Sequence, residues 1–141
     1  MSKTLTYRDL DAWKVAMELV EAVYRLIPLL PDTEKYGLAS QMRRSSVSIP
    51  SNIAEGQARG TAKFGLYFIR IAIGSVAEVD TQLELVRRLK FVTVEGTREL
   101  DNYVPRVRQL LYGMRREHER RLVGAATVFS LLLLGATRLF S

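Results

Sequence analysis

Apolar residues recur at spacings of three and four along most of the chain, and this periodicity constrains the fold more than any other feature. Such spacing places apolar side chains on one side of an α-helix, whereas a half-buried strand requires strict alternation. The pattern occupies four segments, at residues 13–27, 38–53, 64–86 and 100–114. No stretch carries a strand signal, so we predict an all-α fold, an antiparallel up-down four-helix bundle.

Residues that favour helix ends separate these segments. Pro28 and Pro31 are expected to end the first helix, and Gly60 suits the left-handed conformation that often follows a helix. Pro50 predicts a kink in the second helix, and Pro105 predicts a bend or a later start in the fourth. Helix starts are predicted at side chains that cap a first turn, namely Asp9 or Asp11, Asp32 or Thr33, Thr61 and Thr93.

The second helix has an unusually polar side within residues 41–60. At about 100° per residue, its polar and apolar residues fall on opposite sides. The polar side consists of Gln41, Arg44, Ser48, Ser51, Asn52, Glu55 and Arg59, and the apolar side consists of Leu38, Met42, Ile49 and Ile53. The apolar side fits the core of a bundle, so the polar side is expected to face nucleic acid or another subunit.

The amino-acid composition excludes several kinds of metal and covalent site. The chain has no cysteine and one histidine, His118, which excludes disulfides, thiolate metal sites and, within one chain, paired-histidine metal sites. No histidine stands three residues after Glu55 or Glu78, so the Glu-x-x-His spacing of di-iron bundles is absent. We therefore predict a protein without catalytic activity, metal or cofactor.

Positive charge is concentrated late in the chain. The formal net charge is +6, and residues 101–141 hold seven Lys and Arg against three Asp and Glu. Such an excess favours attraction to nucleic acid or to an acidic membrane, although cations near the end of a helix also complement its dipole. The arginines that we predict to contact nucleic-acid phosphates are Arg43, Arg44, Arg59, Arg106, Arg108, Arg115, Arg116, Arg120 and Arg121.

The C-terminal residues predict an apolar helical extension of the bundle. Fifteen residues from Leu122 to Ala136 carry no charge, with two arginines directly before them and one shortly after them. We therefore divide the chain into a four-helix bundle at residues 1–121 and an apolar tail at residues 122–141. Spanning a bilayer takes about 20 residues, so this run is short. Two alternatives remain, a membrane anchor at residues 122–140 or a tail buried against the bundle or a sister subunit.

Four stretches of the sequence carry a family resemblance. They are Tyr7-Arg8-Asp9-Leu10 with Trp13, Tyr36-Gly37-Leu38, the run from Gln41 to Gly56, and Phe64 with Ile71-Ala72-Ile73-Gly74-Ser75 and Glu78. Over roughly residues 7–115, the chain resembles the bacterial four-helix-bundle family named for reading frames inside intervening sequences of 23S ribosomal RNA genes.

The resemblance implies a small antiparallel bundle that assembles as a ring-like homopentamer. It also implies a distant relation to the accessory variability protein of diversity-generating retroelements, which binds nucleic acid and a reverse transcriptase. It brings no established enzymatic activity.

Two functions from different classes remain open. In the first, a cytoplasmic oligomer binds nucleic acid, RNA rather than DNA, through the arginines named above, and a ring repeats each patch several times. In the second, charged residues pair with one another across a contact between subunits, because buried charges need partners, and the chain is a structural or adaptor oligomer. Its contacts between subunits would involve Arg44, Asn52, Glu55 and Glu78. A reverse transcriptase is a further partner by resemblance, and the tail adds membrane contact as an alternative.

Overall fold

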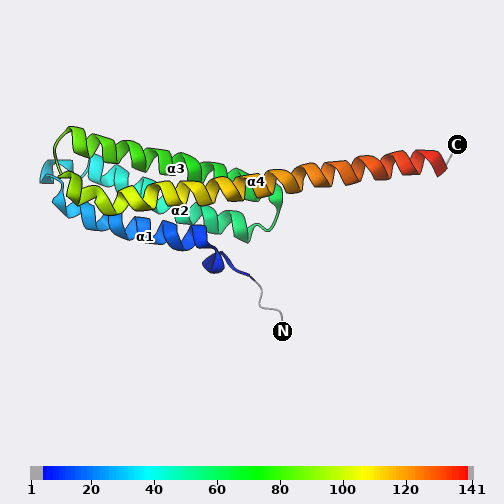
Figure 1. Cartoon of the computed structure of the whole chain (residues 1–141), viewed down its shortest axis with the longest axis horizontal. Coiled ribbons are helices and arrows are strands. Elements are labelled where there is room, and N and C mark those ends of the chain that lie inside the picture. The colour runs from blue at the N-terminus through cyan, green and yellow to red at the C-terminus, as the bar shows by residue number, and fades with distance from the viewer. Residues whose placement is uncertain (1–4, 140–141) are drawn as a thin grey trace.

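Four long helices lie side by side along a common axis, in a computed structural model that describes the backbone of residues 5–139 and the side chains of residues 5–133 (Figure 1). The long helices are α1 (Asp11–Leu26), α2 (Leu38–Ala58), α3 (Ala62–Arg88) and α4 (Val94–Leu139), and short 3-10 helices occupy Tyr7–Asp9, Ile27–Leu29 and Asp32–Glu34. Successive long helices run in opposite directions, and the described residues contain no strand. The predicted all-α up-down bundle and its helical extension are confirmed. Residues 1–4 of the predicted bundle domain and 140–141 of the predicted tail lie outside the described residues.

The core lies between the helices and consists of their apolar sides. Both α2 and α4 contact α1 and α3, which places α1 diagonally opposite α3. Full burial of a large apolar side chain stabilises the fold by about 1.5–3 kcal/mol, and all four helices supply such residues. The fully buried large side chains include Leu19, Val23, Met42, Ile49, Ile53, Ile69, Val76, Val79, Leu83, Val86, Leu100 and Leu111. Met42, Ile49 and Ile53 belong to the predicted apolar side of the second helix, which the structure therefore confirms.

The turns around α3 follow the predicted capping chemistry. Gly60 follows α2 at φ +70°, in the left-handed region that glycine adopts at low cost. The backbone N–H of Phe64 donates to Thr61 Oγ1 at 3.3 Å. The N–H of Gly96 donates in the same way to Thr93 Oγ1 at 3.3 Å. The predicted helix end and both predicted caps are confirmed.

The start of α1 differs from the prediction. Asp9 Oδ2 accepts the backbone N–H of Thr6 at 2.8 Å and closes a 3-10 turn that precedes α1. Leu10 occupies the capping position without a side-chain bond, and Asp11 is the first helical residue. Neither aspartate is therefore the N-cap of α1. Asp9 belongs to the shorter turn, and Asp11 lies inside α1.

The start of α2 also lies later than predicted. Residues 32–34 form a separate 3-10 turn, and Gly37 then adopts a non-helical backbone conformation at φ −94° and ψ −114°. This conformation separates the turn from α2. The carboxylate of Glu34 accepts the backbone N–H of Leu38 at 2.9 Å and satisfies one free donor of the first turn. The predicted N-cap at Asp32 or Thr33 is therefore wrong.

Both internal prolines lie within unbroken helices. Near Pro50, the hydroxyl of Ser51 donates to the backbone carbonyl four residues before it, at 2.8 Å. The carbonyl that lacks a donor because of the proline is that of Ser46, so this bond engages a neighbouring carbonyl. In α4, Pro105 lies well inside a helix that begins at Val94, so the predicted later start is wrong.

One helix, α4, continues past the end of the bundle (Figure 1). Leu122 is half-buried, and every residue from 123 to 133 is exposed. The prediction that the tail is buried against its own bundle is therefore wrong, because the other three helices do not reach it; burial against a sister subunit stays a prediction. We call residues 122–139 the α4 extension. Within the described part of the chain, no helix combines the length and the apolarity needed to cross a membrane.

At the bundle end next to the α4 extension, three helices approach one another through glycines. A Cβ atom placed on Gly65 of α3 would lie 2.3 Å from Cε1 of His118 on α4. A Cβ atom placed on Gly56 of α2 would lie 3.1 Å from Cβ of Phe68 and 3.5 Å from Cα of Gly65. The imidazole of His118 therefore occupies the space that any larger residue at Gly65 would need.

We expect Gly65→Ala to lower the free energy of unfolding by about 1–2 kcal/mol, because the added methyl group displaces the ring of His118. The matched control is Gly74→Ala in the same helix, where a Cβ would meet no atom within 4 Å. The better helix propensity of alanine should raise the free energy of unfolding of that control by up to about 1 kcal/mol. Urea denaturation followed by circular dichroism measures both. Equal effects of the two substitutions would contradict the close contact.

Candidate functional site

One continuous surface joins the polar side of α2 to the adjoining side of α3, and we call it the α2/α3 face. Hydrogen bonds, a shared groove and cation–π contacts connect the two helices along it. The residues of α3 follow one another at spacings of three, four or seven and so share one side of that helix. The face consists of Gln41, Arg44, Ser48, Asn52, Glu55 and Arg59 from α2, and Phe64, Phe68, Ile71, Ser75, Glu78 and Leu85 from α3.

A shallow groove of about 160 Å³ lies toward one end of the face. Among its lining residues are Gln41, Arg44 and Ser48 from α2, and Ser75 and Glu78 from α3. Arg44 and Glu78 are exposed, and neither forms an ion pair with another described residue. The groove therefore presents two opposite charges that a second molecule can pair.

Hydrogen bonds fix the middle of the face. Asn52 Nδ2 donates to the carbonyl and hydroxyl oxygens of Ser48 at 2.7 and 2.9 Å, and Ser75 Oγ donates to Ser48 Oγ at 2.9 Å. Ser45 Oγ donates to Gln82 Oε1 at 2.7 Å, and both residues are buried. Asn52 is thus engaged within its own helix rather than with the charged residues predicted beside it. Sequence reasoning missed the bond to Gln82, whose partners lie 37 residues apart.

At the other end of the face, Arg59 contacts a carboxylate and two aromatic rings. Its Nη2 lies 2.8 Å from Oε1 of Glu55, in the favourable i,i+4 order seen in the sequence. Its guanidinium carbon lies 5.5 Å from the ring centroids of Phe64 and Phe68, a distance typical of cation–π contacts. Arg59 therefore joins the end of α2 to the start of α3, and its charge is engaged within the chain.

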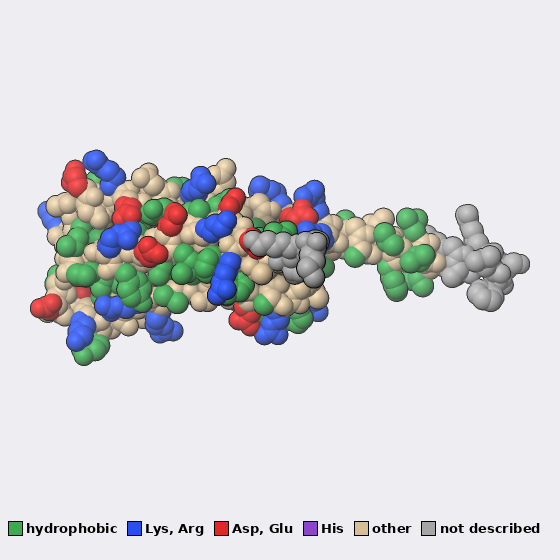
Figure 2. Space-filling model, turned by 90° about the horizontal axis from the view of Figure 1, so that it is seen from below, with side chains coloured by type: hydrophobic (Ala, Val, Ile, Leu, Met, Phe, Trp, Pro, Cys, Tyr) green, Lys and Arg blue, Asp and Glu red, His purple; other side chains and the backbone are tan. Residues whose placement is uncertain are grey.

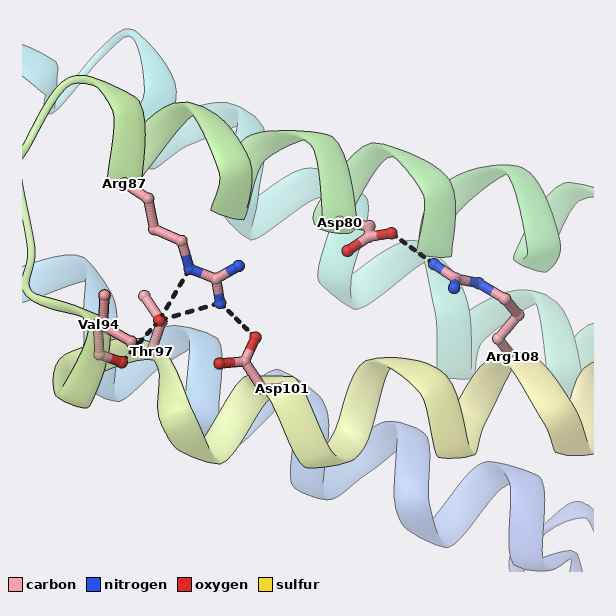
Figure 3. A network of polar contacts seen from close by, with 6 residues as sticks. All are labelled: Asp80, Arg87, Val94, Thr97, Asp101 and Arg108. Atoms are coloured by element: carbon pink, nitrogen blue, oxygen red, sulfur yellow. Dashed lines mark hydrogen bonds and ion pairs between the residues drawn. The ribbon is translucent and has the colours of Figure 1, made fainter.

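Four of the other arginines predicted to contact nucleic acid are paired with carboxylates. The pairs are Arg108–Asp80 at 2.6 Å (Figure 3), Arg115–Glu119 at 3.8 Å, Arg121–Glu117 at 2.9 Å, and Arg120–Glu117. Hydrogen bonding from Arg121 and the charge of Arg120 hold the pKa of Glu117 below its ordinary value. Such exposed pairs contribute little to stability, but together they reduce the positive potential of this segment.

The remaining predicted arginines do not gather in one basic patch. Arg43, Arg44, Arg106 and Arg116 have no ion-pair partner among the described residues. On the side of the molecule shown in Figure 2, Lys and Arg side chains are scattered among Asp and Glu side chains. The structure thus brings Arg44 beside Glu78, but it distributes the other predicted arginines over α2 and α4.

A second polar network holds the turn between α3 and α4 (Figure 3). Nε and Nη2 of Arg87 each donate to Thr97 Oγ1 at 3.0 Å, and this hydroxyl donates to the carbonyl of Val94 at 3.0 Å. Arg87 also pairs with Asp101. Thr97 is fully buried, so its hydroxyl requires such partners. The network is structural, and sequence reasoning missed it because its members meet only when α3 packs on α4.

His118 lies against Gly65 with an unsatisfied ring nitrogen. Its Nδ1 is buried and has no hydrogen-bond partner among the described residues. Burial lowers the pKa of His118 below its ordinary value, the positive charge of Arg121 lowers this pKa further, and Glu117 partly offsets both effects. The fold therefore favours the neutral imidazole.

The described residues offer no group of three or more His, Cys, Asp and Glu side chains that could hold a metal ion. The predictions that the protein lacks catalytic activity and cofactors are not tested by this geometry and stay predictions. The α2/α3 face can pair charges, cover apolar rings and exchange hydrogen bonds. It is therefore a candidate contact surface.

Four antiparallel helices around one apolar core, with a charged and aromatic face on two of them, define a small four-helix-bundle protein. The chain belongs to the family of 23S rRNA-intervening sequence proteins, whose sequence model matches residues 8–113. The family predicted from the sequence is confirmed. The matched residues end before the α4 extension.

A solved structure has the same fold. It is a crystal structure of a protein with unknown function from the S23 ribosomal protein family of Bacteroides thetaiotaomicron VPI-5482, 23% identical, with a TM-score of 0.68 and coverage of 74% of this chain and 95% of that chain. At this identity the likeness shows the fold alone. No curated protein matches the sequence. The homopentamer and the relation to retroelement accessory proteins are not tested by these comparisons and stay predictions.

His118 should make the stability of the bundle depend on pH over the range from neutral to mildly acidic values. Because folding lowers the pKa of His118, the unfolded chain binds a proton more readily, and the free energy of unfolding falls as the pH drops through about 6.5. The loss levels off below the folded-state pKa, where both states are protonated. Urea midpoints of the wild type and of His118→Gln across this range measure the effect, since the chain has one histidine. A pH dependence that is unchanged in His118→Gln would contradict it.

Proposed function

We propose that this protein is a non-enzymatic bundle that assembles with copies of itself through the α2/α3 face. One observation carries the proposal. Phe64, Ile71, Glu78 and Leu85 follow one another every seven residues along α3 and are all exposed, the three apolar ones by 44%, 37% and 42%. Heptad spacing of apolar residues on an exposed helix is typical of a side that packs against another helix.

Charge complementarity supports a second copy as the occupant of this face. Glu78 interrupts the apolar heptad positions, and Arg44 lines the same groove from α2. Neither has an ion-pair partner in the described part of the chain, so two copies can satisfy both residues reciprocally. Tyr67 lies beside the heptad positions and is 60% exposed, which adds an aromatic side chain of the kind enriched at interfaces. The proposal does not depend on ring size, and the homopentamer implied by the family resemblance is one form of it.

Charge reversal tests this contact. We expect Arg44→Glu and Glu78→Arg each to weaken self-association by about tenfold or more, since each places like charges opposite one another. Mixing the two variants should restore assembly, because Glu at position 44 of one copy then meets Arg at position 78 of the other. A pair within one chain cannot produce this rescue, because each variant chain carries only one of the two substitutions. Sedimentation velocity and native mass spectrometry measure all three samples.

The matched control for the charge reversal is Lys14→Glu on α1, the helix diagonally opposite α3. It changes the net charge by the same amount as Arg44→Glu and should leave assembly unchanged. A monomeric wild type, or single variants that assemble as the wild type does, would exclude the proposal.

Binding to nucleic acid is the second candidate, and the arginines without carboxylate partners favour it. Four such arginines and a net charge of +6 leave positive charge available for phosphates. The ion pairs of the other predicted arginines, and the mixture of charges in Figure 2, make this candidate the weaker one. A reverse transcriptase as partner and a cytoplasmic location stay predictions.

Fluorescence anisotropy with single-stranded RNA and duplex DNA over a salt series tests the second candidate. If the protein binds RNA, Arg43→Ala/Arg44→Ala should reduce the slope of log affinity against log salt by about 1.5. The control is Arg88→Ala, which removes an exposed arginine that pairs with Glu84 at 2.7 Å. Absence of binding at low salt, or identical slopes in all three proteins, would exclude nucleic-acid binding through α2.

A further inference from the structure

The α4 extension exposes large apolar side chains that no other part of the described chain covers. Val123, Val128, Phe129, Leu131, Leu132 and Leu133 are exposed by 54–68%. Figure 1 shows this part of α4 beyond the ends of the other helices, and Figure 2 shows apolar side chains along it. These residues lie outside the part of the chain that matches the family, so the family fold does not account for them.

The apolar residues point in every direction around the helix axis. Each residue turns the helix by about 100°, so the consecutive side chains of Leu131, Leu132 and Leu133 lie on three different sides. Val128 and Phe129 point in two further directions. A partner helix covers one side of its neighbour, whereas hydrocarbon surrounds a helix completely. The all-round distribution therefore fits lipid better than a single protein partner.

A cationic segment directly precedes these residues. Residues 115–121 contain four arginines and two glutamates, which gives a charge of 4 − 2 = +2 with His118 neutral. Arg116 has no ion-pair partner among the described residues, and the side chains of Arg120 and Arg121 are 78% and 63% exposed. Ion pairs as exposed as these exchange readily with other anions. Arginines beside an apolar helix are attracted to anionic lipid headgroups, and one charged segment with one apolar segment supplies the two signals that stable membrane attachment needs.

We propose that the α4 extension inserts into one side of an anionic membrane and holds the bundle at its surface. Residues 115–121 lie at the headgroups and residues 122–133 lie among the acyl chains. The eighteen residues of the α4 extension are about 27 Å long at 1.5 Å per residue, slightly less than the about 30 Å of the hydrocarbon layer, so this helix enters the layer without spanning it. The α2/α3 face stays in water and remains free for other contacts.

Flotation of the full-length protein with lipid vesicles tests this proposal. The vesicles contain phosphatidylcholine alone or phosphatidylcholine with phosphatidylglycerol at about three to one, an anionic surface of the kind that attracts arginine. We expect the protein to float with the anionic vesicles and to bind less as salt is raised. Phe129→Glu/Leu132→Glu should reduce binding by about tenfold or more, since charged side chains are disfavoured among acyl chains. Arg116→Glu/Arg120→Glu should reduce binding to anionic vesicles selectively.

The control variant is Leu29→Glu/Leu89→Glu, which adds the same two negative charges at apolar residues that are 56% and 54% exposed. It should bind vesicles as the wild type does, and circular dichroism confirms that all variants remain helical. Insertion is measured directly with Phe129→Trp, whose fluorescence should be quenched by brominated acyl chains, while that of Leu29→Trp should not.

Two results would overturn the proposal. The first is a wild type that stays unbound with anionic vesicles at low salt, or that binds them as well after Phe129→Glu/Leu132→Glu. The second is a lipid-free oligomer that dissociates in Phe129→Glu/Leu132→Glu and does not bind vesicles, which would assign the α4 extension to contact with a second copy.

Discussion

Burial of the apolar side of α2 holds the bundle together and also decides which side chains the bundle shows to other molecules. Met42, Ile49 and Ile53 are fully buried between the neighbouring helices. Because an α-helix is rigid, their burial turns Arg44 and Glu55 outward. The same applies to α3, where burial of one side leaves a second side exposed with heptad spacing. The α2/α3 face is therefore a consequence of core packing, and its residues cannot turn away without loss of the core.

Two candidate functions depend on the same arginine. Arg44 lines the groove beside Glu78, where it suits contact between copies, and it is also one of the few predicted arginines without a carboxylate partner. A side chain that pairs with a neighbouring subunit is not available to phosphate. Self-assembly and nucleic-acid binding through this residue are therefore competing states rather than additive properties. A chain that does both must use other arginines for one of them.

Sequence reasoning succeeded where a feature depends on neighbouring residues. The helices follow from the spacing of apolar residues, and the caps at Thr61 and Thr93 follow from side chains that bond three residues ahead. The start of α2 was predicted too early, because the sequence does not show that Gly37 adopts a non-helical conformation and separates α2 from the preceding turn.

Features that depend on packing could not be read from the sequence. Within the candidate site, the i,i+4 pair of Glu55 with Arg59 was foreseeable. The bond between Ser45 and Gln82 was not, because it depends on how α2 packs against α3. The ion pairs of the late arginines were not foreseeable either, since their carboxylate partners include Asp80 on another helix. The sequence does not show whether the apolar tail is covered, because an uncharged run is compatible with burial and with exposure.

The continuity of α4 has a further consequence for geometry. A single helix from Val94 to Leu139 forms one wall of the bundle and all of the extension, so there is no loop at which the two can rotate independently. Each residue advances this helix by about 1.5 Å and turns it by about 100°. Inserting one residue near Glu119 would swing the α2/α3 face a quarter turn or more around the extension, whereas inserting seven would return it to nearly the same direction about 10 Å farther away. The number of residues in this segment therefore sets an angle as well as a distance, and it fixes the direction in which the bundle faces.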